Sequence, residues 1–176
     1  MYRPHIKNVV ICAMFAALCC VSTLVVQVPS PLGGYFNLGD CFVLTGAFLL
    51  GGKRGALAGG IGSMLADVFA GYAPYVPGTF IIKSLMALVT GLLFAILSRK
   101  LSPFISRLIA ALFGECLMVL GYLAYEAWCL GYGEGAMVGI FANLTQGMVG
   151  VILSLVLCTL LLQIPGITTH LSVRKE

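Results

Sequence analysis

The stretch that decides the fold is residues 37–83, NLGDCFVLTGAFLLGGKRGALAGGIGSMLADVFAGYAPYVPGTFIIK. Two apolar runs flank a basic glycine turn at 51–54, and three ionisable residues, Asp40, Asp67 and Lys83, lie in or beside apolar segments. An unpaired charge in such a segment costs several kcal/mol. We therefore expect each of these charges to have a partner or a function.

The composition of the whole chain is that of an integral membrane protein. Its 176 residues are 60% hydrophobic and 9% charged, whereas soluble domains carry about 25% charged residues. Long apolar runs separated by turns predict transmembrane helices. The first run lacks a clear small-residue cleavage site and further runs follow at once, so we predict a span there rather than a cleaved signal peptide.

The basic residues alternate between the loops in the positive-inside pattern. Loops near 29–39, 71–77 and 130–135 contain none, and Lys83 stands apart within an apolar run. This pattern predicts both termini in the cytoplasm and an even number of spans. A net charge of +4 distributed in this way does not indicate a nucleic-acid partner. The basic residues of the predicted cytoplasmic segments are Arg3, Lys7, Lys53, Arg54, Arg99, Lys100, Arg107, Arg174 and Lys175.

We predict an all-α integral membrane fold, with a single domain over 1–176 that is a bundle of six transmembrane helices. The second span is short, because ten or eleven helical residues rise only about 16 Å and a bilayer core is about 30 Å thick. Small residues recur at every fourth position of the third span, which predicts a tightly packed central helix. The expected spans are 8–27, 40–51, 55–71, 78–98, 107–128 and 135–163.

Polar side chains of four predicted spans lie at a similar depth in the outer leaflet. Lys83 is roughly 8–9 Å along its helix at about 1.5 Å per residue, and Asp67 lies at the same depth in the preceding span. We expect Asp67 to pair with Lys83, since a nearby opposite charge favours the ionised form. Snorkelling of Lys83 to the interface is the alternative. Glu126, Asn143 and Gln146 reach this depth from the fifth and sixth spans.

Two further features admit both a structural and a functional interpretation. Asp40 directly precedes an apolar run. This position favours a role as a helix N-cap over a functional role. Tyr35 belongs to a Pro/Gly-rich loop and is either an interfacial anchor or part of a lid over a site. The aromatic residues around Glu126 suit a flat heteroaromatic ligand with polar edges, and an interfacial aromatic belt explains them equally well.

Motifs for several kinds of chemistry are absent from the sequence. It contains no GxxxxGK[ST] loop, no HExxH and no GxSxG, and His5 and His170 lie in the tails. The seven cysteines form no CxxC and no Cys/His cluster with metal-ligand spacing, so we interpret them as small buried residues. We therefore predict no catalytic residue, no metal site and no enzyme activity in this chain.

The motifs of residues 13–95 resemble the substrate-binding S components of energy-coupling factor (ECF) transporters. The resemblance is closest to the branch for riboflavin-type, pyridoxine and hydroxymethylpyrimidine uptake. The motifs that carry it are NLGD at 37–40, LLGG at 49–52, GGIGS at 59–63 with Ala66-Asp67, GYA at 71–73 and FIIK at 80–83.

The resemblance implies an external vitamin site closed by the loop after the first span. It implies an AxxxA strip, here Ala13 and Ala17, that docks on a transmembrane coupling subunit, although Val21 ends the strip. It also implies two partner ATPases that use ATP, no cofactor in this chain, and a multi-pass protein of a prokaryotic plasma membrane. The S component is expected to topple in the bilayer to carry its ligand across.

We therefore predict a vitamin-binding S component for a pyridoxine or hydroxymethylpyrimidine type of ligand, else riboflavin. Two alternatives remain open, an ion-coupled carrier with a proton relay through Asp67, Lys83 and Glu126, and a structural membrane protein whose buried charges lock helix pairing. The predicted ligand-binding residues are Lys83, Asn143 and Gln146 as donors, Tyr35, Tyr75 and Tyr125 as stacking rings, and Asp67 and Glu126 as carboxylates.

Overall fold

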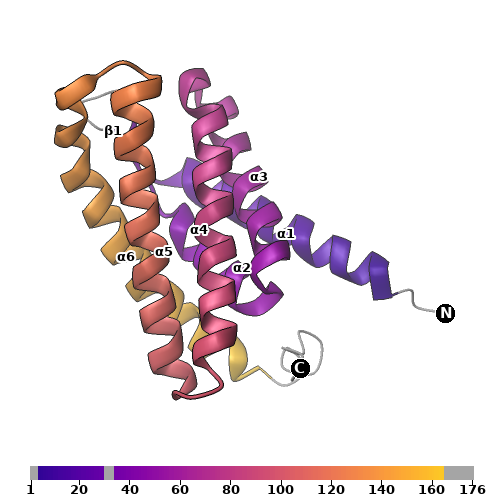
Figure 1. Cartoon of the computed structure of the whole chain (residues 1–176). Helices are drawn as coiled ribbons and strands as arrows, with labels where there is room; N and C mark the ends of the chain where they lie inside the picture. Colours follow the sequence, from indigo (N-terminus) through magenta and orange to yellow (C-terminus); the bar gives the residue numbers. More distant parts are fainter. Residues whose placement is uncertain (1–3, 30–33, 165–176) are drawn as a thin grey trace.

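A short and almost completely buried helix, α2 (Gly39–Leu50), occupies the centre of a helical bundle. Ten of its twelve residues are buried, so it contacts protein on nearly every side. The bundle is seen in a computed structural model that describes residues 4–29 and 34–164 (Figure 1). The helices that pack against α2 are α1 (Pro4–Val25), α3 (Gly52–Ala70), α4 (Val76–Leu97), α5 (Pro103–Ala124) and α6 (Met137–Leu162).

Glycines and a serine cap define several of the connections between the helices. Gly51, between α2 and α3, and Gly71, at the end of α3, both have φ of 80°, a left-handed value that glycine adopts without a Cβ penalty. A 3₁₀ turn, η1 (Ala73–Tyr75), leads into α4. Ser102 caps α5 by accepting a hydrogen bond from the Ile105 amide at 3.4 Å. The α5 helix continues into a π-helical turn, η2 (Tyr125–Cys129), and a second 3₁₀ turn, η3 (Gly133–Ala136), leads into α6.

Four segments of the described chain are long and apolar enough to cross a bilayer. The α2 helix is apolar but shorter, and α3 has 19 residues with a lower apolar content. The predicted all-helical membrane fold is confirmed, while six crossings and the orientation of the termini stay predictions. Arg3, Arg174, Lys175 and His170 lie outside the described residues. The four segments are Ile6–Val25, Ala73–Leu97, Pro103–Cys129 and Gly133–Leu162.

The small residues of α3 allow close packing against its neighbours. An added Cβ at Gly55 would lie 2.7 Å from the Ala47 Cα of α2, and one at Gly62 would lie 2.3 Å from the Ala16 carbonyl oxygen of α1. The tight packing predicted for the third span is therefore present. The central position, however, belongs to α2, because α2 is enclosed by helices while α3 leaves Leu57 and Phe69 exposed.

A small hairpin covers one end of the bundle. Strands β1 (Val28–Pro29) and β2 (Tyr35–Phe36) pair antiparallel, with Val28 opposite Phe36. Strand β2 contacts α6. Residues 30–33 of the predicted lid-like loop lie outside the described residues.

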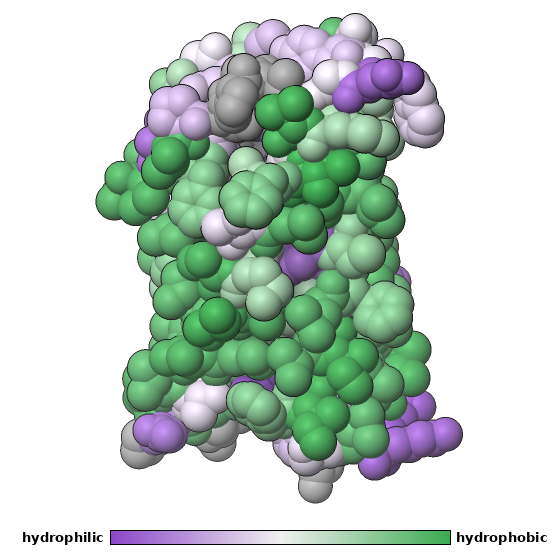
Figure 2. Space-filling view, turned by 90° about the vertical axis from the view of Figure 1, so that its left-hand side faces the viewer, coloured by the Kyte–Doolittle hydropathy of each residue, from purple (hydrophilic) through white to green (hydrophobic). Residues whose placement is uncertain are grey.

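The outer surface fits a lipid environment. Figure 2 shows an apolar surface across the middle of one face, with hydrophilic residues gathered toward both ends. Large side chains such as Phe113 and Phe141 are exposed on helices in this chain. Because water would disfavour so much exposed apolar area, the bundle is suited to a bilayer.

Candidate functional site

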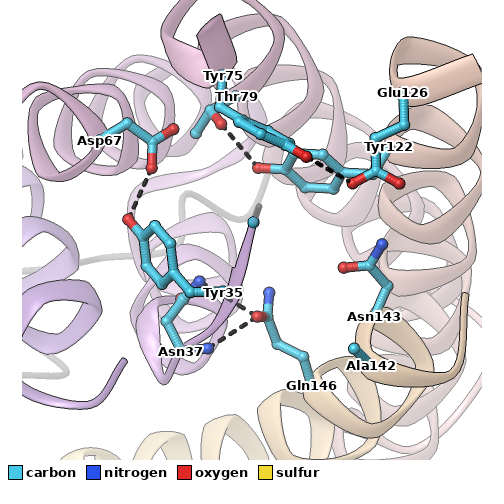
Figure 3. Close-up of a pocket in the computed structure, with 11 residues that line it drawn as sticks. Tyr35, Asn37, Asp67, Tyr75, Thr79, Tyr122, Glu126, Ala142, Asn143 and Gln146 are labelled. Atoms are coloured by element: carbon cyan, nitrogen blue, oxygen red, sulfur yellow. Dashed lines mark hydrogen bonds between the residues drawn. The ribbon is translucent and has the colours of Figure 1, made fainter. Parts of the chain in front are cut away.

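A polar cavity of about 40 Å³ lies at the end of the bundle opposite the basic turns at 51–54 and 99–100. It is enclosed by α3, the η1–α4 junction, the α5–η2 junction, α6 and the segment around β2 (Figure 3). The lining residues are Gly34, Tyr35, Asn37, Asp67, Tyr75, Thr79, Tyr122, Glu126, Ala142, Asn143 and Gln146.

Asp67 supplies a buried carboxylate from the last turn of α3. Its Oδ1 accepts a hydrogen bond of 2.7 Å from the Tyr35 hydroxyl. Its Oδ2 is buried and accepts no hydrogen bond within the described part of the chain. The Thr79 hydroxyl lies beside this carboxylate and is 3.0 Å from the Tyr122 hydroxyl. Asp67 thus retains an oxygen that a donor on a ligand can use.

Tyr35 holds the hairpin against α3. Burial, followed by the charge of the neighbouring Asp67 carboxylate, raises the pKa of the Tyr35 hydroxyl well above its ordinary value. The hydroxyl therefore keeps its proton at neutral pH and serves as the donor to Asp67.

Glu126 supplies a second buried carboxylate on the opposite side of the cavity (Figure 3). It belongs to the π-helical turn η2, a form of helix that occurs frequently at functional sites. Its Oε1 accepts a 3.3 Å hydrogen bond from the Tyr75 hydroxyl. Its Oε2 has no hydrogen-bond partner among the described residues. The cavity is therefore flanked by two acceptor oxygens without donors.

Gln146 and Asn143 reach the cavity from one side of α6. The Gln146 Oε1 accepts hydrogen bonds from the Asn37 backbone N–H at 2.9 Å and from the Asn37 Nδ2 at 3.2 Å. Asn143 points into the space between Gln146 and Glu126 (Figure 3). Gln146 thus ties α6 to the residue that follows β2 by one position.

The predicted pairing of Asp67 with Lys83 is wrong. Lys83 is buried and forms an ion pair with Asp40 Oδ1, while Asp40 Oδ2 accepts a 2.6 Å hydrogen bond from Gln146 Nε2. The carboxylates of Asp40 and Asp67 both lie within electrostatic range of the Lys83 ammonium group. Asp40 forms the contact because α2 lies between α4 and α6. The prediction that Lys83 is ion-paired is confirmed, and the buried geometry excludes snorkelling to the interface.

The predicted capping role of Asp40 is also wrong. The α2 helix begins at Gly39, which places Asp40 inside its first turn. Leu38 occupies the N-cap position without a side-chain hydrogen bond, and Asn37 Oδ1 accepts the Gly39 N–H at 2.9 Å. Glycine is required at position 39, because an added Cβ would lie 2.9 Å from Asn37 Oδ1 and 2.1 Å from the Thr23 hydroxyl oxygen. The NLGD motif therefore delivers a buried carboxylate to the bundle.

Lys83 and Tyr125 do not line the cavity, although both were predicted to bind ligand. Lys83 lies behind the wall, 5.5 Å from the centroid of the Tyr122 ring. The Tyr125 hydroxyl donates to the Pro74 carbonyl at 2.7 Å. The other six predicted side chains do line it: Tyr35, Asp67, Tyr75, Glu126, Asn143 and Gln146.

Thr79 and Asn37 line the cavity without having been predicted, and Tyr122, one of the aromatic residues around Glu126, lines it as well. Thr79 precedes Lys83 by four residues and Tyr122 precedes Glu126 by four, so each shares a helical face with a predicted residue. The four-residue spacing to Lys83 and Glu126 could therefore have predicted both residues. No sequence pattern predicts that Asn37 lines the cavity, because its position depends on the contact between α6 and β2.

Glu115 lies outside the cavity and close to the Asp40–Lys83 pair. Its side chain fits a notch in α6, where an added Cβ at Gly147 or Gly150 would meet it at 3.1 Å or 2.7 Å. Neither carboxylate oxygen has a hydrogen-bond partner within residues 4–29 and 34–164. Glu115 is therefore packed against α6 rather than hydrogen-bonded within the described part of the bundle.

A second hollow is an apolar groove of about 760 Å³ between α1 and α3. Ala13 and Ala17 are both exposed on its floor, with Leu57, Ile61 and Phe69 along its other side. The predicted docking strip is therefore open to the surroundings rather than packed within the bundle.

The chain matches one transporter family and is similar to two further proteins. Residues 4–163 match the family described as ECF-type riboflavin transporter, S component. A Lactococcus lactis protein, the thiamine precursor transporter HmpT, is 28% identical over 92% of this chain and 91% of its own length. A Pyrococcus woesei protein, described as an uncharacterized protein in gap 3′ region, is 36% identical over 76% of this chain and 86% of its own.

Proposed function

The chain belongs to the family of ECF-type riboflavin transporter S components, and we propose that it captures a hydroxymethylpyrimidine-type thiamine precursor from outside the cell. It is then a subunit of a transporter and not an enzyme. The predicted membership in the ECF S components is confirmed by the match over residues 4–163. The choice of ligand rests on the cavity and on the similarity to the thiamine precursor transporter HmpT.

The observation that carries the choice of ligand is that each of two buried carboxylates keeps one oxygen without a donor. Asp67 Oδ2 and Glu126 Oε2 have no hydrogen-bond partner in the described part of the chain, and both residues line the cavity. A buried acceptor left unpaired costs about 1–3 kcal/mol. A ligand that donates hydrogen bonds at two edges relieves this cost. A hydroxymethyl aminopyrimidine does so, with its amine on one side and its hydroxyl on another.

Riboflavin fits these groups less well. The polar edge of the flavin ring presents two carbonyl oxygens around one N–H, so that edge needs protein donors, and the donating hydroxyl groups of riboflavin are confined to its ribityl chain. The cavity of about 40 Å³ has room for only a few water molecules. A single ring therefore requires a smaller movement of Tyr35 or Tyr75 than three fused rings require.

Aromatic rings beside the cavity favour a flat ligand. Tyr35 and Tyr72 have ring centroids 4.6 Å apart, and Tyr72 and Tyr75 follow at 6.4 Å. Stacking on such rings adds binding energy without selecting one heterocycle over another. Pyridoxine is consequently the second candidate, because its hydroxyl groups also donate to carboxylates.

Binding measurements on the purified protein test the ligand. We expect an aminopyrimidine to bind more tightly than pyridoxine or riboflavin in isothermal titration calorimetry, and we expect its mass in the copurified fraction. Asp67→Asn and Glu126→Gln should each weaken binding by about tenfold or more, since each removes a charged acceptor. Thr145→Val on the exposed side of α6 is the matched control. Tighter binding of riboflavin would overturn the ligand assignment.

Transport requires partners in this proposal. The exposed groove containing Ala13 and Ala17 receives an apolar helix of a transmembrane coupling subunit, and two ATPase subunits of that module use ATP. We also propose that the protein lies in a prokaryotic plasma membrane.

The competing function, an ion-coupled carrier, is tested in liposomes containing this protein alone. Uptake driven by a pH gradient without ATPases would refute the ECF mechanism.

A further inference from the structure

We propose that Asp40 is a positioning residue for the ligand site. It sets the orientation of the Gln146 amide and thereby holds Asn37 and strand β2 over the cavity. Asp40 and Lys83 do not line the cavity themselves. The inference rests on the proposed function for its ligand, but its first readout requires no ligand.

The argument begins with the hydrogen-bonding capacity of the two side chains. An ionised carboxylate only accepts, whereas an amide has a donating NH₂ end and an accepting oxygen end. Asp40 Oδ2 accepts from Gln146 Nε2 at 2.6 Å, so the oxygen end of Gln146 must face away from Asp40. That oxygen accepts both the backbone N–H and the Nδ2 of Asn37, at 2.9 Å and 3.2 Å.

Lys83 fixes the carboxylate in this arrangement. It pairs with Asp40 Oδ1, and both side chains are almost completely buried. Because Lys83 can only donate, it requires an oxygen at that position. The remaining oxygen of Asp40 is thereby reserved for Gln146. The chain of contacts therefore runs from α4 through α2 and α6 to the residue that follows Phe36 of β2.

Asn37 transmits this order to the cavity wall. Its Oδ1 accepts the Gly39 N–H at 2.9 Å, which joins it to the start of α2. Tyr35 lies two residues earlier and donates to Asp67 at 2.7 Å. Release of Asn37 from Gln146 would therefore loosen the segment that places Tyr35 on the Asp67 carboxylate.

The substitution Asp40→Asn tests the orientation directly. Lys83 would still require the side-chain oxygen, so the new NH₂ group would face Gln146. The Gln146 amide would then turn over and present its own NH₂ group to the two Asn37 donors. We expect the hydrogen exchange of the Asn37 amide in ligand-free nanodiscs to accelerate by about tenfold or more. Thr145→Val, in the same turn of α6 but exposed, should leave it unchanged.

A double substitution separates this role from simple charge balance. Asp40→Leu with Lys83→Met removes the buried ion pair, a replacement that folded proteins often tolerate. We expect a normal melting temperature, yet fast exchange at Asn37, because Gln146 has lost its acceptor. Wild-type protection of Asn37 in this variant would overturn the proposal.

A second cycle tests the route through Gln146. Once Gln146→Met is present, Asp40→Asn should add nothing further to the exchange rate of Asn37. If the effects of Gln146→Met and Asp40→Asn on the exchange rate of Asn37 multiply, Asp40 acts by a route other than Gln146 and the inference is refuted.

The ligand readout follows in the same variants. We expect Asp40→Asn to raise the dissociation rate of the aminopyrimidine by about tenfold or more, in parallel with the exchange at Asn37. If the wild-type protein binds no aminopyrimidine, the proposed ligand fails while the exchange result stands. If the wild type binds and Asp40→Asn changes neither rate, the positioning role fails alone.

Discussion

Tyr35 links the β hairpin to α3 by donating its hydroxyl to the buried Asp67 carboxylate at 2.7 Å. Removing the hydroxyl in Tyr35→Phe keeps the ring but leaves Asp67 Oδ1 without this donor. We expect the free energy of unfolding at pH 7 to fall by about 1–3 kcal/mol. Denaturant unfolding in detergent measures the change. An unaltered free energy of unfolding would mean that water satisfies the Tyr35 hydroxyl and the Asp67 carboxylate as well as their mutual hydrogen bond does.

The same residue predicts a dependence on alkaline pH. The pKa of the Tyr35 hydroxyl is raised in the folded protein by burial and by Asp67, so the unfolded chain loses this proton first. The stabilisation by Tyr35 is complete below the ordinary tyrosine pKa of about 10 and declines above it. Melting curves of wild type and Tyr35→Phe between pH 8 and pH 11 should converge as the pH rises. A constant difference would contradict the assignment.

Close helix contacts determine the arrangement at the scale of the elements. The α1–α3 contact depends on Gly62, where a Cβ would lie 2.3 Å from the Ala16 carbonyl oxygen and 2.7 Å from the Cys19 Cβ. These are backbone and Cβ atoms, so they cannot move aside as a flexible side chain does. The helices must separate instead.

Gly62→Ala should therefore destabilise the bundle by about 1–3 kcal/mol and lower its melting temperature. Gly135→Ala is the matched control, because a Cβ there meets nothing within 4 Å. Equal melting temperatures of the two variants would refute the packing argument.

At the scale of the whole molecule, the exposed groove between α1 and α3 is the surface on which we expect the coupling subunit to bind. Ala17→Trp or Ala13→Trp would fill the groove between α1 and α3. We expect loss of assembly with the coupling subunit in a pull-down, while ligand binding survives. Val10→Trp is the control, since Val10 is exposed on α1 but does not line the groove. Loss of ligand binding alone would place the strip in an internal role.

Membrane orientation is a second property of the whole molecule. The basic turns at 53–54 and 99–100 predict cytoplasmic loops, and the segment near 130–135 is predicted to face outward. Alkaline phosphatase fused after Gly133 should be active, whereas the same enzyme fused after Lys100 should be inactive. The reverse activities would invert the predicted topology and place the cavity on the cytoplasmic side.

The helical membrane fold and much of the cavity could be predicted because they depend on properties of individual segments. Apolar length, small-residue spacing and depth along a helix axis follow from the chain and from a rise of about 1.5 Å per residue. These quantities placed Asp67, Glu126, Asn143 and Gln146 at one end of the bundle. They could not place Asn37, whose role depends on a contact between α6 and the residue after β2.

The sequence by itself determined a multi-pass helical protein with buried charges, since lipid requires every backbone polar group to be satisfied within its own helix. Only the tertiary structure decided which charges meet. The depth along the helices indicated Asp67 as the partner of Lys83, but the position of α2 between α4 and α6 brings Asp40 to Lys83 instead. Asp67 was thereby left with an oxygen for a ligand. The physical reason is that depth follows from the helical rise, whereas the direction of a side chain toward its neighbours is set by packing.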